Sequence, residues 1–303
     1  MRRAPSGALG LLKHKDLFMS RFARSWLLIK ASMDVLRNDN ALLVLPAISG
    51  VMTMLVAGGF VALAVSDGTF AAMAAAGRHH YAPPAFYAWL FCMYVVQYFV
   101  VIFFNTALVG AAIVLLGGGQ PTVWDGLKLA ISRIGPILGY AIISATVGVL
   151  LQLVAEKLGF VGRLIAGGLG LAWTAATFLV VPILAAEGVG PWQAIERSGE
   201  LLRKTWGENL IGNAGISLVM STISGAVAVV GFGGGFLLFR RGYEVLGVAL
   251  ISAAATAFLL VVLVGAALAG IYSAAVYWYA ASGKPPVDFD GDLISGAFTH
   301  KSA

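Results

Sequence analysis

The sequence predicts an all-α, polytopic membrane protein with six transmembrane helices. Its 303 residues are 59% hydrophobic and only 11% charged, whereas soluble domains carry about 25% charged residues. Six windows contain no Asp, Glu, Lys or Arg, and each exceeds the roughly 20 residues that cross a hydrocarbon core of about 30 Å. A short amphipathic stretch recurs three times outside these windows. Together these features predict three units related by a parallel repeat, each an interfacial amphipathic helix followed by a helical hairpin.

The repeated stretch is clearest between Pro191 and Arg203. Its spacing, Trp192, Ile195, Ser198, Leu202 and Arg203, recurs near the N-terminus as Trp26, Ile29, Ser32, Leu36 and Arg37. A weaker copy has Trp124, Leu127, Ala130 and Ile134, in which the serine is replaced by alanine and the final arginine is lost. The repeat divides a single membrane domain, 1–303, into units 16–120, 121–190 and 191–285, with tails 1–15 and 286–303.

The first element in the chain is a predicted helix over 16–37. Apolar side chains recur there at steps of three and four residues, which places them on one helix face. The basic residues lie off that face; they are Arg21, Arg24, Lys30 and Arg37. A helix with an apolar aromatic face and a basic polar face lies in the plane of the lipid headgroups.

The apolar windows predict the six spans that follow, at 41–65, 85–116, 135–155, 164–186, 209–231 and 245–281. The last span is much longer than a bilayer requires, so it must overhang, tilt or break. Tyr and Trp residues near its end favour overhang, because these side chains prefer the membrane interface.

Glycine marks the predicted ends and contacts of these spans. Each second span stops at a glycine followed closely by proline, at Gly119, Gly190 and Gly283, and glycine readily adopts the left-handed conformation that ends a helix. Glycines four residues apart, such as Gly231 and Gly235, suit close helix packing. The segment 231–235, GFGGG, is alternatively a flexible outer turn.

Most of the 20 Lys and Arg residues lie on one side of this topology, in the segments that precede odd-numbered spans or follow even-numbered ones. Because cytoplasmic loops are rich in Lys and Arg, the pattern predicts that both termini and all three interfacial helices are cytoplasmic. We therefore expect a multi-pass protein of the cytoplasmic (inner) membrane.

Polar side chains are scarce within the predicted spans. The candidates are the amides Gln97, Asn105, Gln152, Asn209 and Asn213. Asn105, well inside the second span, either contacts a solute or makes an interhelical hydrogen bond, and the second interpretation is favoured. The single cysteine, Cys92, excludes an intrachain disulfide and a cysteine-built metal site. We predict no catalytic residue, cofactor or metal, and no enzyme activity.

Several segments resemble a bacterial and archaeal family of six-span integral membrane proteins whose function is unknown. The matching segments are 25–50, 97–112, 177–210, 271–283 and 289–298. The resemblance implies a multi-span inner-membrane protein and supplies no catalytic residues. The segment from Val180 to Trp192 is also similar to membrane domains attached to some glycerophosphodiester phosphodiesterases. The soluble, metal-binding phosphodiesterase domain is absent from this sequence, so that activity is not implied.

These features favour a non-enzymatic accessory, scaffold or lipid-organising protein. Its expected partners are membrane lipids and either another membrane protein or a second copy, with no nucleic acid. The residues expected at lipid headgroups or partners are Arg21, Arg24, Lys30, Arg37, Arg197, Arg203 and Lys204, because cations beside anionic lipids contribute about 1 kcal/mol each. The alternative is a transporter or channel for a small or amphipathic solute, with Asn105 lining its path.

Overall fold

The structure is a computed structural model that describes residues 41–66, 68, 84–205 and 219–283. All secondary structure in these ranges is helical. Six helical segments are long and apolar enough to cross a membrane: 42–66, 87–116, 134–157, 159–186, 219–240 and 244–282. Their length and composition are those of a multi-pass membrane protein. The predicted helix over 16–37, the start of the fifth span and both tails lie outside the described residues.

The first two spans form an antiparallel pair, α2 (Ala41–Ser66) and α4 (Pro84–Leu116). Pro46 lies inside α2, which continues through it. α4 passes directly into a short connection and then α5 (Val123–Ser132), which packs back against it. The close approach depends on small residues, because a side chain at Gly126 would meet the Ala107 carbonyl oxygen at 2.6 Å.

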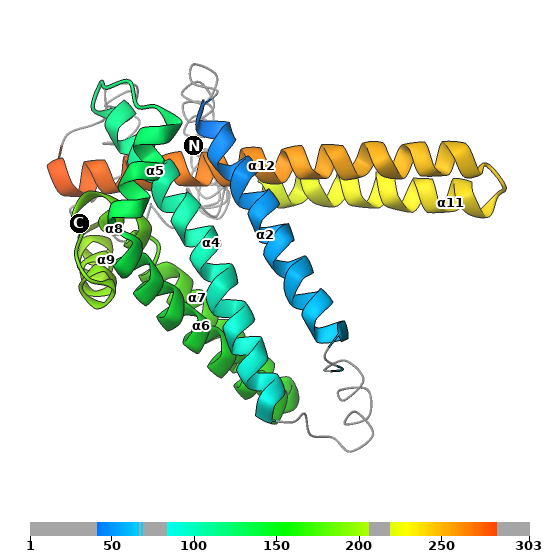
Figure 1. Cartoon of the computed structure of the whole chain (residues 1–303), viewed down its shortest axis with the longest axis horizontal. Coiled ribbons are helices and arrows are strands. Elements are labelled where there is room, and N and C mark those ends of the chain that lie inside the picture. Colours follow the sequence, from blue (N-terminus) through cyan, green and yellow to red (C-terminus); the bar gives the residue numbers. More distant parts are fainter. Residues whose placement is uncertain (1–40, 67, 69–83, 206–218, 284–303) are drawn as a thin grey trace, which may run out of the picture.

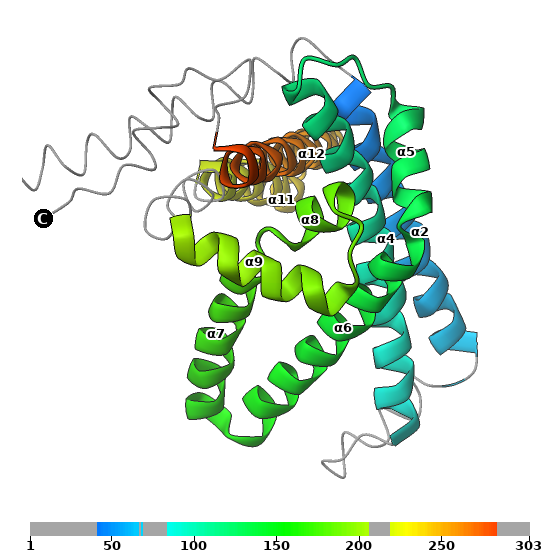
Figure 2. The same ribbon diagram turned by 90° about the vertical axis from the view of Figure 1, so that its left-hand side faces the viewer.

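The fourth span is broken. α6 (Ile134–Lys157) forms the third span, but the predicted continuous helix over 164–186 is two helices, α7 (Gly159–Ala176) and α8 (Val180–Ala186). Pro182 supplies the local reason, since it has no N–H to donate to the Phe178 carbonyl four residues earlier. The predicted span at 164–186 is therefore present, but it is interrupted before Pro182. α9 (Pro191–Thr205) follows α8 and runs across the ends of α6 and α7 (Figure 2).

The fifth span continues past the predicted end at residue 231. Segment 231–235 is helical and lies in the π-helical segment η1 (Ala228–Gly233) and in α11 (Gly234–Arg240). The chain turns instead at Gly242, whose φ is +85°. The outer-turn interpretation of GFGGG was wrong because this segment is helical and Gly231, Gly234 and Gly235 pack against the sixth span, α12 (Glu244–Ser282). A side chain at Gly231 would overlap the Ala254 side chain.

α12 is one unbroken helix of 39 residues. It ends at Gly283, whose φ of +67° is the left-handed conformation predicted for a glycine stop. The corresponding left-handed glycines after α4 and α8 are Gly118 and Gly188, slightly before the predicted Gly119 and Gly190. The glycine–proline endings therefore mark the right turns, and in two of them the left-handed glycine lies one or two residues before the predicted one.

The largest buried core forms where the spans meet, and we call it the junction core. It includes residues 107–112 of α4, 179–185 in and before α8, and 267–277 of α12, together with Ala194 and Leu201 of α9. The other half of α12 pairs with α11 and projects from this core as an arm, 228–262, which runs across Figure 1 while α2, α4 and α6 run obliquely to it. The three-unit parallel repeat stays a prediction.

Candidate functional site

The predicted interfacial helices that the structure describes are α5 and α9, which lie beside the ends of the spans. α5 begins with a capping box: the Thr122 backbone N–H and hydroxyl both donate to Asp125 Oδ2, at 3.0 and 2.6 Å, and Asp125 N–H donates to Thr122 Oγ1 at 3.2 Å. The hydrogen bond from the Thr122 side chain lowers the pKa of the Asp125 carboxyl from its ordinary value of 3.8. This cap begins the helix one residue before Trp124, whose side chain is 57% exposed.

α9 buries one face and exposes the other. Ala194, Ser198 and Leu201 are buried in the junction core or beside it, whereas Trp192 is 64% exposed. Trp124 and Trp192, which open the second and third copies of the repeated stretch, therefore both point away from the core. An exposed tryptophan on a short helix next to apolar spans is typical of the membrane–water interface, because its ring is apolar and its N–H is polar.

Ser198 explains why the break in the fourth span is tolerated. Its hydroxyl donates to the Ala176 carbonyl oxygen at 2.6 Å and accepts from the Leu179 N–H at 3.2 Å. These two backbone groups flank the break, and a buried backbone group without a partner is costly. One fully buried side chain of α9 thus replaces bonds that a continuous helix would make. At the equivalent position of α5, Ala130 is also buried, but it packs against the unbroken α4.

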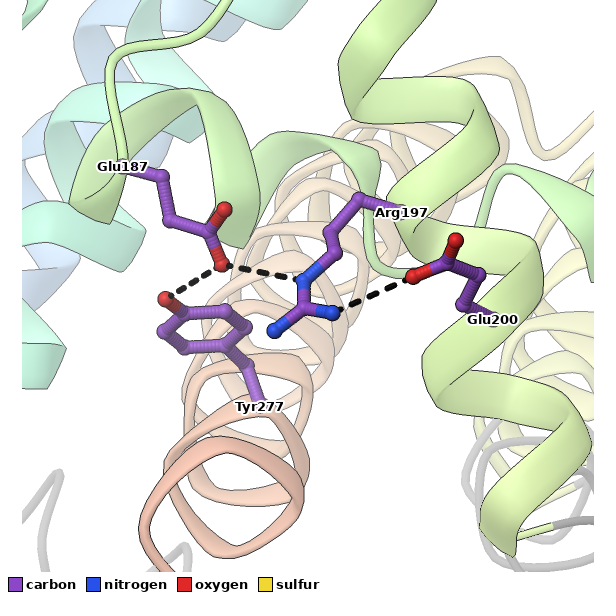
Figure 3. A network of polar contacts seen from close by, with 4 residues as sticks. All are labelled: Glu187, Arg197, Glu200 and Tyr277. Atoms are coloured by element: carbon purple, nitrogen blue, oxygen red, sulfur yellow. Dashed lines mark hydrogen bonds and ion pairs between the residues drawn. The ribbon is translucent and has the colours of Figure 1, made fainter.

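A polar network joins α8, α9 and α12 (Figure 3). Tyr277 Oη donates to Glu187 Oε1 at 3.1 Å, and Arg197 Nε lies 3.7 Å from the same oxygen. Arg197 Nη1 donates to Glu200 Oε2 at 3.1 Å. Glu187 caps the C-terminus of α8, so its carboxylate connects the end of the broken span with both the interfacial helix and the last span.

Arg133 is a further candidate for contact with lipid headgroups, and the sequence analysis did not single it out. It lies between α5 and α6, and its guanidinium occupies the space that a side chain at Gly188 would fill. Gly188 has a φ of +66° in the turn between α8 and α9, so Arg133 joins the end of α5 to the segment that leads into α9. Its Nε is buried without a hydrogen-bond partner among the described residues. The available signal was its position, directly between an amphipathic helix and an apolar span.

The residues predicted to contact lipid headgroups differ in their exposure and in their ion pairs. Arg203 is exposed on α9, and no ion pair joins it to an acid in the described ranges. Arg197 is partly exposed but shared between Glu187 and Glu200. The side chain of Lys204 and the predicted contacts Arg21, Arg24, Lys30 and Arg37 lie outside the described residues. Lys128, which was not predicted, is exposed on α5 with its Nζ 5.8 Å from the Trp124 ring centroid.

Asn105 lines a cavity of about 300 Å³ between α2, α4, α8 and α12. Its walls are mainly apolar, and its polar side chains are Ser49, Asn105 and Ser273. Ser273 donates to the Gly270 carbonyl oxygen at 2.9 Å, whereas neither Ser49 nor Asn105 has a side-chain hydrogen bond within the described part of the chain. The interpretation of Asn105 as an interhelical hydrogen-bonding residue stays a prediction.

Two other predicted intramembrane amides make interhelical contacts. Gln97 Nε2 donates to the Thr53 carbonyl oxygen of α2 at 3.4 Å. Gln152 Oε1 accepts from Tyr94 Oη at 3.2 Å, which joins α6 to α4, and Gln152 Nε2 donates to Glu156 at 2.9 Å. Asn209 and Asn213 lie outside the described residues. Asn105, by contrast, lines the cavity and makes no hydrogen bond with the described helices.

Comparison with known proteins identifies the family without supplying an activity. A family model described as "Family of unknown function (DUF6159)" matches residues 84–287, about two thirds of the chain, from α4 to just beyond α12. A search of curated proteins finds no match. Neither comparison bears on the resemblance to phosphodiesterase membrane domains, which stays a prediction. Because the family model covers the junction core, both described interfacial helices and Asn105, the chain belongs to this DUF6159 family of unknown function.

Proposed function

We propose that the protein is a non-enzymatic component of the cytoplasmic membrane that binds anionic lipid headgroups at its inner face and organises lipids or membrane partners around it. In this proposal both termini and the interfacial helices α5 and α9 are cytoplasmic. The predicted helix over 16–37 joins them as the first of three repeated units.

One observation carries the proposal. α5 and α9, which follow the ends of the second and fourth spans, each present an exposed tryptophan together with an exposed cation. The cations Lys128 and Arg203 form no ion pair with an acid in the described ranges. A cation near an anionic leaflet contributes about 1 kcal/mol, and a tryptophan fixes the depth of the helix in the interface. Arg133, between the two helices, adds a third cation.

Arg197 has a different role in this proposal. Its charge is balanced by Glu187 and Glu200, so its main contribution is to hold α9 against α8 and α12. The surface for headgroups is therefore defined by Lys128, Arg133 and Arg203 in the described part of the chain, and we call it the inner cationic surface.

The test is lipid retention in mixed phosphatidylglycerol and phosphatidylcholine nanodiscs, followed by native mass spectrometry. Neutralising Lys128 and Arg203 together to Gln should lower the bound phosphatidylglycerol about tenfold or more, since each contact contributes roughly 1 kcal/mol. The matched control neutralises Arg240 and Arg241, which lie at the opposite end of the spans. Equal retention by the two double variants would refute the proposal.

The second candidate function is transport of a small amphipathic solute, and the cavity beside Asn105 favours it. In proteoliposomes, transport would carry NBD-labelled lysophosphatidylcholine to the inner leaflet, where dithionite does not reach it. Filling the cavity with Ala269→Phe should then abolish the protected fraction. If the wild-type protein gives the same rate as protein-free liposomes, transport of this class of solute is excluded.

A further inference from the structure

The cavity between α2, α4, α8 and α12 has the position and chemistry of a ligand site. Along the helix axes, at about 1.5 Å per residue, Ser49, Asn105 and Ser273 lie roughly 12 to 17 Å from the ends of their helices on the α5 and α9 side. The hydrocarbon core is about 30 Å thick. These depths are about half of the core thickness, so the cavity lies close to the bilayer midplane.

Two polar side chains of the cavity, Ser49 and Asn105, have no hydrogen-bond partner among the described residues and lie beside apolar walls. The Asn105 amide can donate two hydrogen bonds and accept others, and it makes none with described residues. Its Oδ1 lies 3.5 Å from where a side chain at Gly270 would begin, so the glycine keeps space open in front of it. An amide without partners in a low-dielectric region is costly, which favours an occupant that can hydrogen-bond to it.

The remaining wall selects against charge. Phe104, Leu108, Phe178 and Val181 supply apolar surface, and no charged residue is among those that line the cavity. A buried charge without an opposite partner is much more costly than a buried hydroxyl or amide. The fitting occupant therefore has a neutral hydrogen-bonding group beside a hydrocarbon segment.

Its size is limited by the cavity. A volume of about 300 Å³ is at the small end of ligand pockets and equals roughly ten waters at about 30 Å³ each. Bulk water is a poor filling, because each buried water needs two to four polar partners and the polar side chains are few. A short single-chain molecule fits the volume and both kinds of wall.

The broken span contributes one wall. Phe178 lies in the break between α7 and α8, and the Ser198 hydroxyl bonds the backbone on both sides of it, at Ala176 and Leu179. Ser198 is therefore a positioning residue for the Phe178 side of the cavity. The interfacial helix α9 sets the cavity wall, although it contributes no lining residue itself.

We propose that this cavity binds one small, neutral, single-chain amphiphile, with its hydroxyl or amide group hydrogen-bonded to Asn105 and its hydrocarbon segment against Phe104, Phe178 and Val181. This goes beyond headgroup binding at the inner cationic surface. It does not require transport.

The experiment uses three photoactivatable probes of equal chain length in nanodiscs containing the full chain: octanol, octanoic acid and octane. At about pH 8 the acid is ionised, since a carboxyl pKa is ordinarily near 4. Mass spectrometry of the cross-linked peptides should place octanol on 101–108, 178–181 or 266–273. Octanol should label these segments about threefold to tenfold more than octane, which corresponds to one hydrogen bond, and octanoic acid should label them least.

Two variants test the amide and the space of the cavity separately, and a third, Gln97→Leu, is their control. Asn105→Leu removes the amide at similar size and should reduce octanol labelling to the octane level. Ala269→Phe fills the cavity and should remove labelling by every probe. Gln97→Leu removes another intramembrane amide, outside the cavity, and should retain the wild-type preference. Size-exclusion profiles and melting temperatures without probe identify any variant that has failed to fold.

Three results would overturn the inference: equal labelling by octanol and octane, preferential labelling by the acid, or labelling that neither Asn105→Leu nor Ala269→Phe changes. Octanol binding without movement of NBD-labelled lysophosphatidylcholine would support the inference and count against transport of that solute. If Ala269→Phe loses octanol labelling but still moves NBD-labelled lysophosphatidylcholine, octanol binding in the cavity and movement of that solute are independent of each other.

Discussion

The two halves of α12 belong to two different kinds of helix packing. In the junction core, residues 267–277 place bulky side chains such as Leu268 and Ile271 among those of α4 and α8, and these side chains are completely buried. In the arm, the same helix approaches α11 at Gly247 and η1 at Ala254, and it leaves its large side chains outside, with Val245 84% exposed. A single continuous helix therefore passes from interlocked side chains to backbone contact.

The difference shows what each region needs from its surroundings. Within a membrane, lipid tails are as apolar as leucine, so helix association depends on close packing more than on burial from water. The junction core obtains this packing from several helices and includes the polar network of Glu187, Arg197 and Tyr277. The arm obtains it from small residues of only two described helices, and the rest of its apolar surface requires lipid.

The largest expected effect comes from the same truncation at two positions of α12. Leu268→Ala in the junction core should lower the free energy of unfolding by about 2 to 5 kcal/mol, because it leaves a cavity among buried neighbours. Leu246→Ala in the arm removes a side chain that is 60% exposed and should change stability by less than about 0.5 kcal/mol. Thermal unfolding in nanodiscs measures both. Similar losses would show that the two halves pack alike.

The arm is expected to be sensitive to added rather than removed atoms. A Cβ at Gly247 would lie 2.8 Å from the Gly235 carbonyl oxygen and 2.9 Å from Phe239 N, and backbone atoms cannot move aside as a flexible side chain can. Gly247→Ala should therefore cost about 1 to 3 kcal/mol and increase hydrogen exchange in 228–262. Gly225→Ala is the control, since a Cβ there meets no atom within 4 Å. A stable Gly247→Ala would rule out backbone contact as the basis of the arm.

A smaller loss is expected at the break that shapes the junction core. Ser198→Ala removes the hydroxyl that serves both Ala176 and Leu179, and should cost about 1 to 2 kcal/mol because buried backbone groups lose their partners. Ser132→Ala on α5 is matched, since its hydroxyl donates only to its own helix at Leu129. Exchange should increase at 177–181 and not in the arm. Unchanged exchange at 177–181 would show that Pro182 and packing alone hold the break.

The smallest effect on stability is expected at the N-terminal cap of α5, which belongs to neither half of α12. The folded state lowers the pKa of Asp125 below 3.8, so the stabilisation is present above that value and is lost as the pH falls through the lowered pKa. Hydrogen exchange of 122–128, corrected for intrinsic rates, should therefore rise below about pH 3.8, the ordinary pKa of an aspartate. Thr122→Ala should remove this pH dependence. A wild-type response equal to that of Thr122→Ala would contradict the assignment.

Prediction from sequence was most accurate where one physical rule acts locally. Six windows without charged residues, each long enough to cross a bilayer, located all six apolar segments. The amphipathic pattern of apolar and polar residues located α9, and Gly283 ends α12 in the left-handed conformation that its glycine predicted. These properties depend on neighbours within a few residues, so the sequence alone determined them.

The break at 177–179, the cavity and the role of Arg133 required the tertiary structure. Pro182 favours a break, but its buried backbone groups are satisfied only because Ser198, about twenty residues later in the chain, lies beside them. Asn105 faces a cavity because α2, α8 and α12 surround it without offering a partner in the described ranges. Residues far apart in the chain decide these features, whereas the six apolar segments follow from composition that each carries within itself.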